Sequence, residues 1–196
     1  MESINLKIFN LINASSSTNE LTINVAIILA NSVIYFVPVF LVLSWLFGDN
    51  DKKEIALKSV SVALISLAVA QMIVAIYPHP RPFMIGIGRT LIEHAPDPSF
   101  PSDHMTLFSS IAITYLIGRY YKLGLAILFA GFAVGWSRVY LGVHFPFDMV
   151  GAIIISLCVA TAIQPIWKML GKPITKVAII IYGKLFRIPI KNGWIK

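Results

Sequence analysis

Long apolar runs separated by short polar segments dominate the chain. Five such runs occupy residues 21–47, 55–77, 102–119, 123–140 and 146–170, and charged residues are sparse within them. About 20 apolar residues in a helix suffice to cross a bilayer. The pattern therefore predicts an all-α polytopic membrane bundle of about five transmembrane helices.

Local signals set the ends of these runs. Pro38 lies inside the first run and predicts a kink there. Three prolines within residues 78–82 end the second run, because proline cannot continue a helix. Ser102 is a good N-cap for the third run, and Pro146 suits the first position of the fifth. The third and fourth runs are short, which predicts little tilt or ends that lie in a water-filled cleft.

The two ends of the chain differ from the apolar centre. Residues 1–20 combine apolar positions with a polar turn and predict an interfacial helix, with no removable signal peptide. Residues 171–196 contain no acidic residue and several lysines, which predicts a basic amphipathic tail on the cytoplasmic side. The tail either binds an anionic leaflet or serves only to orient the protein. We thus expect one domain over residues 1–196, with the bundle at 21–170.

The composition agrees with this interpretation. The 196 residues are 57% hydrophobic and 13% charged, far from the balance of soluble proteins. The net charge of +7 does not indicate a nucleic-acid partner, because no charged surface interleaved with aromatic residues accompanies it. The single cysteine, Cys158, lies in an apolar run and is expected to be buried and inert.

The distribution of positive charge predicts the topology. Lysines and arginines near residues 52–53 and 119–122, together with the basic tail, belong on the cytoplasmic side. The loops at residues 79–102 and 138–145 then face the outside. All four histidines fall on that one face, which is not expected of histidines with scattered structural roles.

The outward residues have the chemistry for phosphoryl transfer. His144 can attack phosphorus if its other ring nitrogen is held by an acceptor, and Asp148 lies four residues later. Arg81 and Arg138 offer planar guanidinium groups that bind phosphate bidentately. The alternatives are that Asp148 is only an acid in the first turn of a helix and that the arginines snorkel to the interface.

A third segment, residues 102–104, adds a helix start. Free backbone N–H groups after Ser102 form a phosphate-binding position. His104 is placed to protonate a leaving oxygen as a general acid. Asp103 is interpreted as orienting a neighbour, or else as an ordinary acid near a helix N-terminus.

These segments together resemble a known signature. Arg81-Pro82, Pro101-Ser102-Asp103-His104, and Ser137-Arg138 followed by His144 and Asp148 occur in the order of the type 2 phosphatidic acid phosphatase superfamily. Residues 79–83 and 99–104 are similar to its bacitracin-resistance branch of undecaprenyl-diphosphate phosphatases. Three blocks in order on one predicted face are far more specific than any single block.

The resemblance implies a metal-independent reaction without a cofactor. His144 would form a phosphohistidine supported by Asp148, with His104 as the acid. Arg81, Ser102 and Arg138 would hold the phosphoryl group. The lysine of the signature is replaced by Val74 and its glycine by Asp103, so that Arg89 or His79 is expected to supply the missing charge.

The sequence therefore predicts a membrane phosphatase that removes the terminal phosphate of undecaprenyl diphosphate at the outer face of the plasma membrane. Such an enzyme recycles the lipid carrier of cell-envelope polymers and confers bacitracin resistance. A broader lipid phosphatase or a phosphotransferase would use the same chemistry. A transport component is the alternative of another class, although the predicted spans lack the ionisable residues at mid-membrane that transporters use. The oligomeric state stays open.

Overall fold

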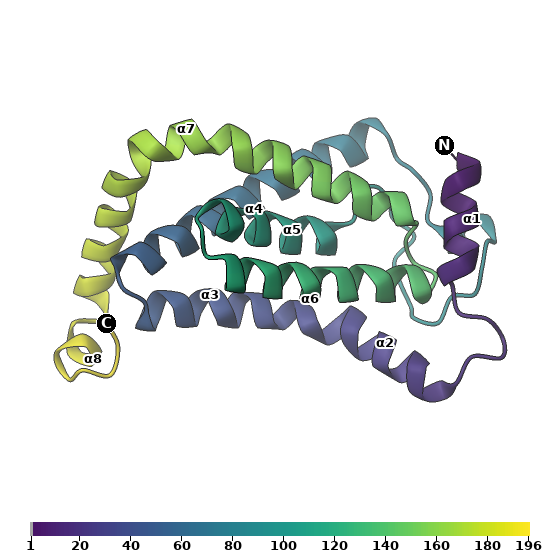
Figure 1. Ribbon diagram of the computed structural model, residues 1–196, viewed down its shortest axis with the longest axis horizontal. Coiled ribbons are helices and arrows are strands. Elements are labelled where there is room, and N and C mark those ends of the chain that lie inside the picture. Colours follow the sequence, from purple (N-terminus) through teal and green to yellow (C-terminus); the bar gives the residue numbers. More distant parts are fainter. Residues whose placement is uncertain (1) are drawn as a thin grey trace.

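The computed structural model describes residues 2–196, which fold as a bundle of helices (Figure 1). Its elements, in chain order, are α1 (Glu2–Ile12), α2 (Glu20–Ser32), η1 (Val33–Tyr35), α3 (Phe36–Phe47), α4 (Asn50–Ile76), η2 (Pro82–Ile85), α5 (Asp103–Ile117), α6 (Tyr121–Tyr140), α7 (Pro146–Leu185) and α8 (Arg187–Lys191). Four segments of the described chain are long and apolar enough to cross a membrane: 20–47, 50–76, 121–140 and 146–185. The prediction of an all-α, multi-pass membrane bundle is confirmed.

The first span bends where its proline requires it. A short 3₁₀ turn, η1, separates α2 from α3 just before Pro38. Proline has no N–H to donate to the carbonyl four residues earlier, and its ring pushes that carbonyl away. That carbonyl belongs to Ile34, in the middle of η1. The expected kink is present, and it turns α2 outward from the bundle in Figure 1.

Helix α5 forms the centre of the bundle and packs against α4, α6 and α7. Ten of its 15 residues are buried. Glycines on α6 allow close approach, since a Cβ at Gly131 would lie 2.7 Å from Phe108 Cβ and one at Gly124 would lie 2.7 Å from Leu116 Cγ. Small residues at such contacts are how helices associate in lipid, where close packing replaces the hydrophobic effect.

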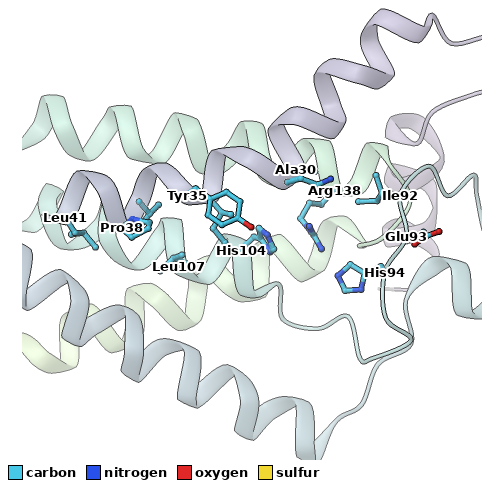
Figure 2. Close-up of a pocket in the computed structure, with 13 residues that line it drawn as sticks. Ala30, Tyr35, Pro38, Leu41, Ile92, Glu93, His94, His104, Leu107 and Arg138 are labelled. Atoms are coloured by element: carbon cyan, nitrogen blue, oxygen red, sulfur yellow. The ribbon is translucent and has the colours of Figure 1, made fainter. Parts of the chain in front are cut away.

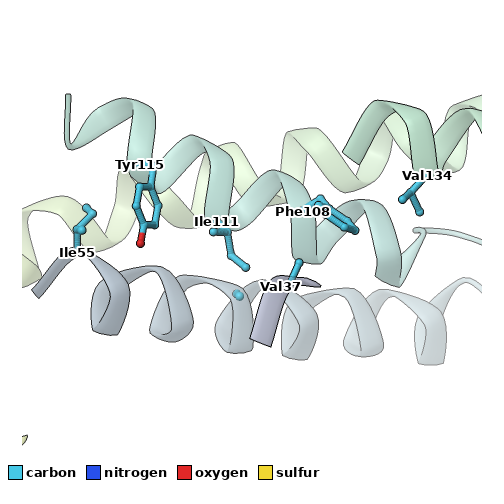
Figure 3. Packing of buried hydrophobic residues seen from close by; sticks show 7 residues of the cluster. Val37, Ile55, Phe108, Ile111, Tyr115 and Val134 are labelled. Carbon is cyan, nitrogen blue, oxygen red and sulfur yellow. The ribbon is translucent and has the colours of Figure 1, made fainter. Parts of the chain in front are cut away.

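Two features fix α5 against its neighbours. Its apolar side meets α3, α4 and α6 in the cluster shown in Figure 3, formed by Val37, Ile55, Ala63, Phe108, Ile111, Tyr115 and Val134. On the α7 side, Ser110 Oγ donates to Ser156 Oγ at 3.0 Å, and Ser156 Oγ lies 3.1 Å from the Thr106 carbonyl. A helix of 15 residues is about 22 Å long, shorter than the ~30 Å hydrocarbon core. By length alone, α5 therefore does not cross the hydrocarbon core.

The last span ends well beyond residue 170, where the sequence predicted its end. Helix α7 continues without interruption to Leu185, with Pro165 and Pro173 inside it. Figure 1 shows it bending in its second half, as internal prolines cause, so that its end passes across the far end of the bundle. Tyr182 packs there against Trp45, with ring centroids 6.0 Å apart. The helix therefore includes residues 171–185, which the sequence analysis assigned to a separate tail.

The prediction that Cys158 is buried is wrong. Its side chain is exposed on the outer side of α7. An apolar run in a membrane helix need not face the protein, because lipid accepts apolar side chains as readily as a core does.

The helices run so that all four histidines gather at one end. The loop 77–102, the start of α5, the end of α6 and the start of α7 meet at the end of the bundle that also carries α1 (Figure 1). The turn before α4, the turn between α5 and α6, and the C-terminus lie at the opposite end. There Lys53 Nζ donates to the carbonyl of Lys196 at 2.9 Å. This arrangement matches the grouping of loops inferred from charge.

We expect Gly142→Ala to destabilise the protein more than Gly86→Ala. Both glycines have positive φ, +82° and +69°, which costs a residue with a Cβ about 1–2 kcal/mol. Only at Gly142 would that Cβ also meet backbone, at 2.3 Å from the Arg89 carbonyl oxygen, which adds about 1–3 kcal/mol of overpacking. Thermal denaturation of the two variants in detergent measures the difference. Equal losses would contradict the close contact between residue 142 and the loop at residue 89.

Candidate active site

His144 and Asp148 form a buried pair at the start of α7. His144 Nδ1 lies 3.0 Å from Asp148 Oδ2, and the same oxygen accepts from the Phe145 backbone N–H at 2.8 Å. The four-residue spacing works because Pro146 starts the helix, so that Asp148 occupies its first turn and reaches back to the loop. A carboxylate accepts from Nδ1, which therefore carries the proton and leaves the lone pair on Nε2.

Arg81 links two loops to the free nitrogen of His144. Its Nη1 lies 2.9 Å from His144 Nε2 and donates to the Val143 carbonyl, also at 2.9 Å. On its other side, Nε lies 3.1 Å from Asp97 Oδ1, and Nη2 donates to the Pro98 carbonyl at 3.2 Å. The guanidinium is buried, and it holds a positive charge directly beside the nitrogen that would act as a nucleophile.

Arg138 brings a second buried guanidinium with spare hydrogen-bonding capacity. It comes from the last turn of α6, is 4% exposed, and its Nε has no hydrogen-bond partner within residues 2–196. Leaving a buried donor of this kind unpaired costs free energy, because the group has lost its water. Arg138 lines a polar cavity of about 200 Å³ with Arg81, His104 and His144. Two guanidiniums and two imidazoles around one cavity suit an anion, such as a phosphoryl group.

The start of α5 completes this cavity. Ser102 is the buried N-cap, and its Oγ accepts from the Met105 N–H at 3.4 Å. Its own N–H donates to the carbonyl of Asp148 at 3.2 Å, which ties the start of α5 to α7. Asp103 and His104 follow in the first turn and both line the cavity. Gln71 Nε2 donates to Asp103 Oδ1 at 3.0 Å, which fits the interpretation that Asp103 orients a neighbour.

Two of the predicted phosphate ligands lie elsewhere. The Arg89 side chain is exposed, and its Nη1 donates to the Ser15 carbonyl at 2.8 Å, so that it fastens the loop to the segment after α1. His79 Nδ1 lies 3.2 Å from Ser99 Oγ, and its ring lines a separate cavity on the far side of Asp148. The structure brings neither residue into the cavity, and the idea that one of them supplies the missing positive charge is not supported. Both residues lie in the loop that was predicted to face outward, but that loop directs Arg89 to the segment after α1 and His79 to the separate cavity.

Two titratable residues of the cavity, His94 and Asp97, were given no role in the sequence analysis, although His94 was one of the four histidines placed on one face. Asp97 binds Arg81, and His94 Nδ1 lies 3.3 Å from Asp97 Oδ1. The His94 ring centroid is 6.3 Å from that of His144. The signals for them were the place of His94 on the predicted histidine face and the spacing of three residues between His94 and Asp97 in the polar loop.

Burial and positive charge act together on the titratable groups of these loops. Burial, followed by the charges of Arg81 and Arg138, holds the pKa of His144 well below its usual value. Burial also lowers the pKa of His94, helped by the same two arginines and opposed by its hydrogen bond to the Ala95 carbonyl. Burial raises the pKa of Asp97, but the hydrogen bond and charge of Arg81 outweigh this effect and the net pKa is lowered. The imidazole of His144 is thus held neutral beside two cations.

An apolar groove continues from the polar cavity. It has a volume of about 730 Å³ and runs between α2, η1 and α3 on one side and α5 on the other (Figure 2). Its apolar walls include Ile34, Leu41 and Leu107. His94, His104 and Arg138 line both the groove and the polar cavity. A ligand with an anionic head and an apolar tail fits the two together.

Within residues 2–196, no group of three His, Cys, Asp or Glu side chains is arranged to hold a metal ion. The carboxylates near the cavity are engaged separately, Asp97 by Arg81, Asp103 by Gln71 and Asp148 by His144.

Known proteins are similar to this chain in sequence and in fold. The model of the PAP2 superfamily matches residues 55–172. A putative undecaprenyl-diphosphatase, YbjG, from Escherichia coli is 34% identical over 196 residues, which cover 100% of this chain and 99% of that protein. The undecaprenyl-diphosphatase BcrC of Bacillus subtilis is 31% identical over 156 residues, 80% of each chain. The crystal structure of Aquifex aeolicus LpxE has the same fold, with a TM-score of 0.62 at 21% identity, covering 81% of this chain and 93% of that one.

We expect His144 to stay neutral well below pH 6.5 in the folded protein. A lowered pKa means that the neutral imidazole persists into more acidic solution. Nitrogen NMR of labelled histidine side chains in detergent micelles, with the His144 signals assigned from a His144→Gln variant, measures the midpoint. A midpoint at or above 6.5 would contradict the effect of burial and the two arginines.

Proposed function

The chain belongs to the PAP2 superfamily, and on that premise we propose that it removes the terminal phosphate of undecaprenyl diphosphate through a phosphohistidine intermediate. The observation that carries the proposal is the arrangement of His144 between an acceptor and a cation. Asp148 holds the proton on Nδ1, and Arg81 lies at the nitrogen that carries the lone pair. This is the geometry that a histidine nucleophile for an anionic phosphorus centre requires.

In the first step, His144 Nε2 attacks the terminal phosphorus and the bridging P–O bond breaks. Arg81 and Arg138 bind the non-bridging oxygens, which carry the charge of the transition state. His104 gives a proton to the departing oxygen, so that undecaprenyl monophosphate leaves. Asp148 stabilises the positive charge that develops on the imidazole ring.

In the second step, water attacks the phosphorus of the phosphohistidine. His104, now without its proton, acts as the base that accepts a proton from this water. The P–N bond breaks, orthophosphate leaves, and neutral His144 is restored. Ser102 supports both steps by fixing the start of α5, whose backbone N–H groups and dipole favour an anion.

The apolar groove supports a lipid substrate. With the polyprenyl tail in the groove and the diphosphate in the polar cavity, the substrate need not leave the bilayer. The distribution of lysine and arginine supports a site on the outer, periplasmic or extracellular, face of the plasma membrane. Hydrolysis there returns the lipid carrier for cell-envelope polymers, and removal of the diphosphate withdraws the target of bacitracin. Two relatives carry the name undecaprenyl-diphosphatase, which supports the same substrate for this chain.

Phosphate release from undecaprenyl diphosphate in detergent, with a chelator present, tests this function. We expect the wild type to be active. The rate of phosphate release should fall at least about 1,000-fold in His144→Ala, because the nucleophile is gone. In Arg138→Lys the rate is expected to fall about 100-fold, because the point charge of an ammonium group replaces a planar guanidinium group. Arg89→Lys makes the same change outside the cavity and is expected to retain activity.

Each alternative predicts a result that differs from these. Full activity of His144→Ala would remove the covalent mechanism, and dependence on added magnesium would remove the metal-independent one. Equal hydrolysis of phosphatidate would favour a broader lipid phosphatase, and transfer of the phosphate to a second lipid would favour a phosphotransferase. Bacitracin resistance without any phosphate release would favour transport.

Cysteine labelling in intact cells tests the side of the membrane. In a Cys158→Ala background, a cysteine at Thr90, which is exposed in the loop before α5, is expected to react with a membrane-impermeant maleimide. A cysteine at Lys191, at the opposite end of the bundle, should react only after permeabilisation. The reverse pattern would place the histidines on the cytosolic side and overturn the proposed location.

A further inference from the structure

His94 lies where the polar cavity opens into the apolar groove. Together with His104 and Arg138 it lines both spaces. Figure 2 shows its ring beside Arg138, at the end of the groove away from Leu41. A lipid diphosphate with its terminal phosphate at His144 and its tail along the groove has its second phosphate between these two places. That phosphate therefore lies among the three residues that line both spaces, of which His94 is one.

The orientation of the His94 ring leaves one nitrogen for a ligand. Nδ1 lies 3.0 Å from the Ala95 carbonyl and 3.3 Å from Asp97 Oδ1, so Nδ1 carries a proton. Nε2 makes no hydrogen bond to any part of the chain between residues 2 and 196. The side chain is 21% exposed, so this nitrogen is accessible from the cavity.

The charges around the ring suit a second anion. Burial, followed by the charges of Arg81 and Arg138, lowers the pKa of His94, while the hydrogen bond to Ala95 and the charge of Asp97 raise it. A phosphate beside the ring adds negative charge that favours protonation, and Nε2–H then donates to a phosphate oxygen.

The other bases that line the two cavities already have roles in the proposed function. Arg81, Arg138 and His144 meet the phosphoryl group that is transferred, and His104 meets the bridging oxygen. No lysine lines either cavity in the described chain, and Val74 presents an apolar side chain to the polar one. His94 is the remaining base of this set.

We propose that His94 binds the lipid-linked phosphate of the substrate and makes the site selective for a diphosphate over a single phosphate group. This inference rests on the proposed function, because it assumes that the terminal phosphate lies at His144. The contact also holds the departing lipid phosphate while the bridging bond breaks. A variant without this contact should therefore have a lower kcat/KM.

Two conservative substitutions separate substrate binding from a structural role. In His94→Asn the amide group lies near the position of Nδ1, so that it keeps the contacts to Ala95 and Asp97 but offers nothing to a phosphate. In His94→Gln the amide lies near Nε2 and still donates to a phosphate. Farnesyl diphosphate, a short-chain lipid diphosphate, is the substrate, and orthophosphate is the competitive inhibitor that occupies only the His144 position.

We expect His94→Asn to lower kcat/KM for farnesyl diphosphate roughly 10- to 100-fold, the effect of one hydrogen bond to a charged group. His94→Gln should stay within about fivefold of the wild type, since it keeps a neutral donor. The inhibition constant of orthophosphate should change less than about twofold in both variants, because the inference assigns the His94 contact to the second phosphate, which orthophosphate does not have. Thermal denaturation in detergent confirms that both variants are folded.

Other outcomes overturn the inference. If His94→Gln loses activity and His94→Asn keeps it, the ring only anchors the loop. If the inhibition constant of orthophosphate rises as much as kcat/KM falls, His94 belongs to the phosphoryl site and does not select for a diphosphate. If the wild type hydrolyses no lipid diphosphate, the proposed function fails. In that case, calorimetry measures the affinity of the wild type and of His94→Asn for inorganic diphosphate and for orthophosphate, which tests the inference separately. An equal loss of affinity for both ligands in His94→Asn, or no loss for either, overturns the inference.

Discussion

The hydrogen bond between His144 Nδ1 and Asp148 Oδ2, 3.0 Å long, is the interaction on which this end of the molecule depends. It joins the loop after α6 to the first turn of α7, and the Asp148 carboxylate also accepts from the Phe145 N–H. It therefore shapes the turn and selects the histidine tautomer at once. With the proton on Nδ1, Nε2 keeps the lone pair that a nucleophile needs, and it lies 2.9 Å from Arg81 Nη1.

Two buried guanidiniums set a second constraint. Arg81 satisfies its hydrogen bonds with loop carbonyls and Asp97, whereas the Nε of Arg138 finds no partner within residues 2–196. Burying positive charge without full compensation disfavours the empty site and favours an anion in it. In this cavity the same two charges, together with burial, keep His144 neutral. The site is thus prepared for a phosphate before the substrate arrives.

The short central helix connects the cavity to the membrane. Ser102 is fully buried at the N-terminus of α5, and His104 in the next turn lines the apolar groove between α3 and α5. The kink at η1 moves α2 outward over this groove. A lipid can then keep its tail among apolar side chains while its head meets the histidines.

The sequence alone determined the helices, their order and the end at which the histidines gather, because apolar run lengths, prolines and charge distribution act locally. It also identified His144, Asp148, His104, Arg81 and Arg138 as residues that could share a cavity, since each lies beside a predicted helix end. Only the tertiary structure decided the rest. It removed Arg89 and His79 from the cavity, brought in His94 and Asp97, and extended α7 past residue 170. The course of a loop and the packing of a bent helix depend on contacts between segments far apart in the chain, and no local pattern records those contacts.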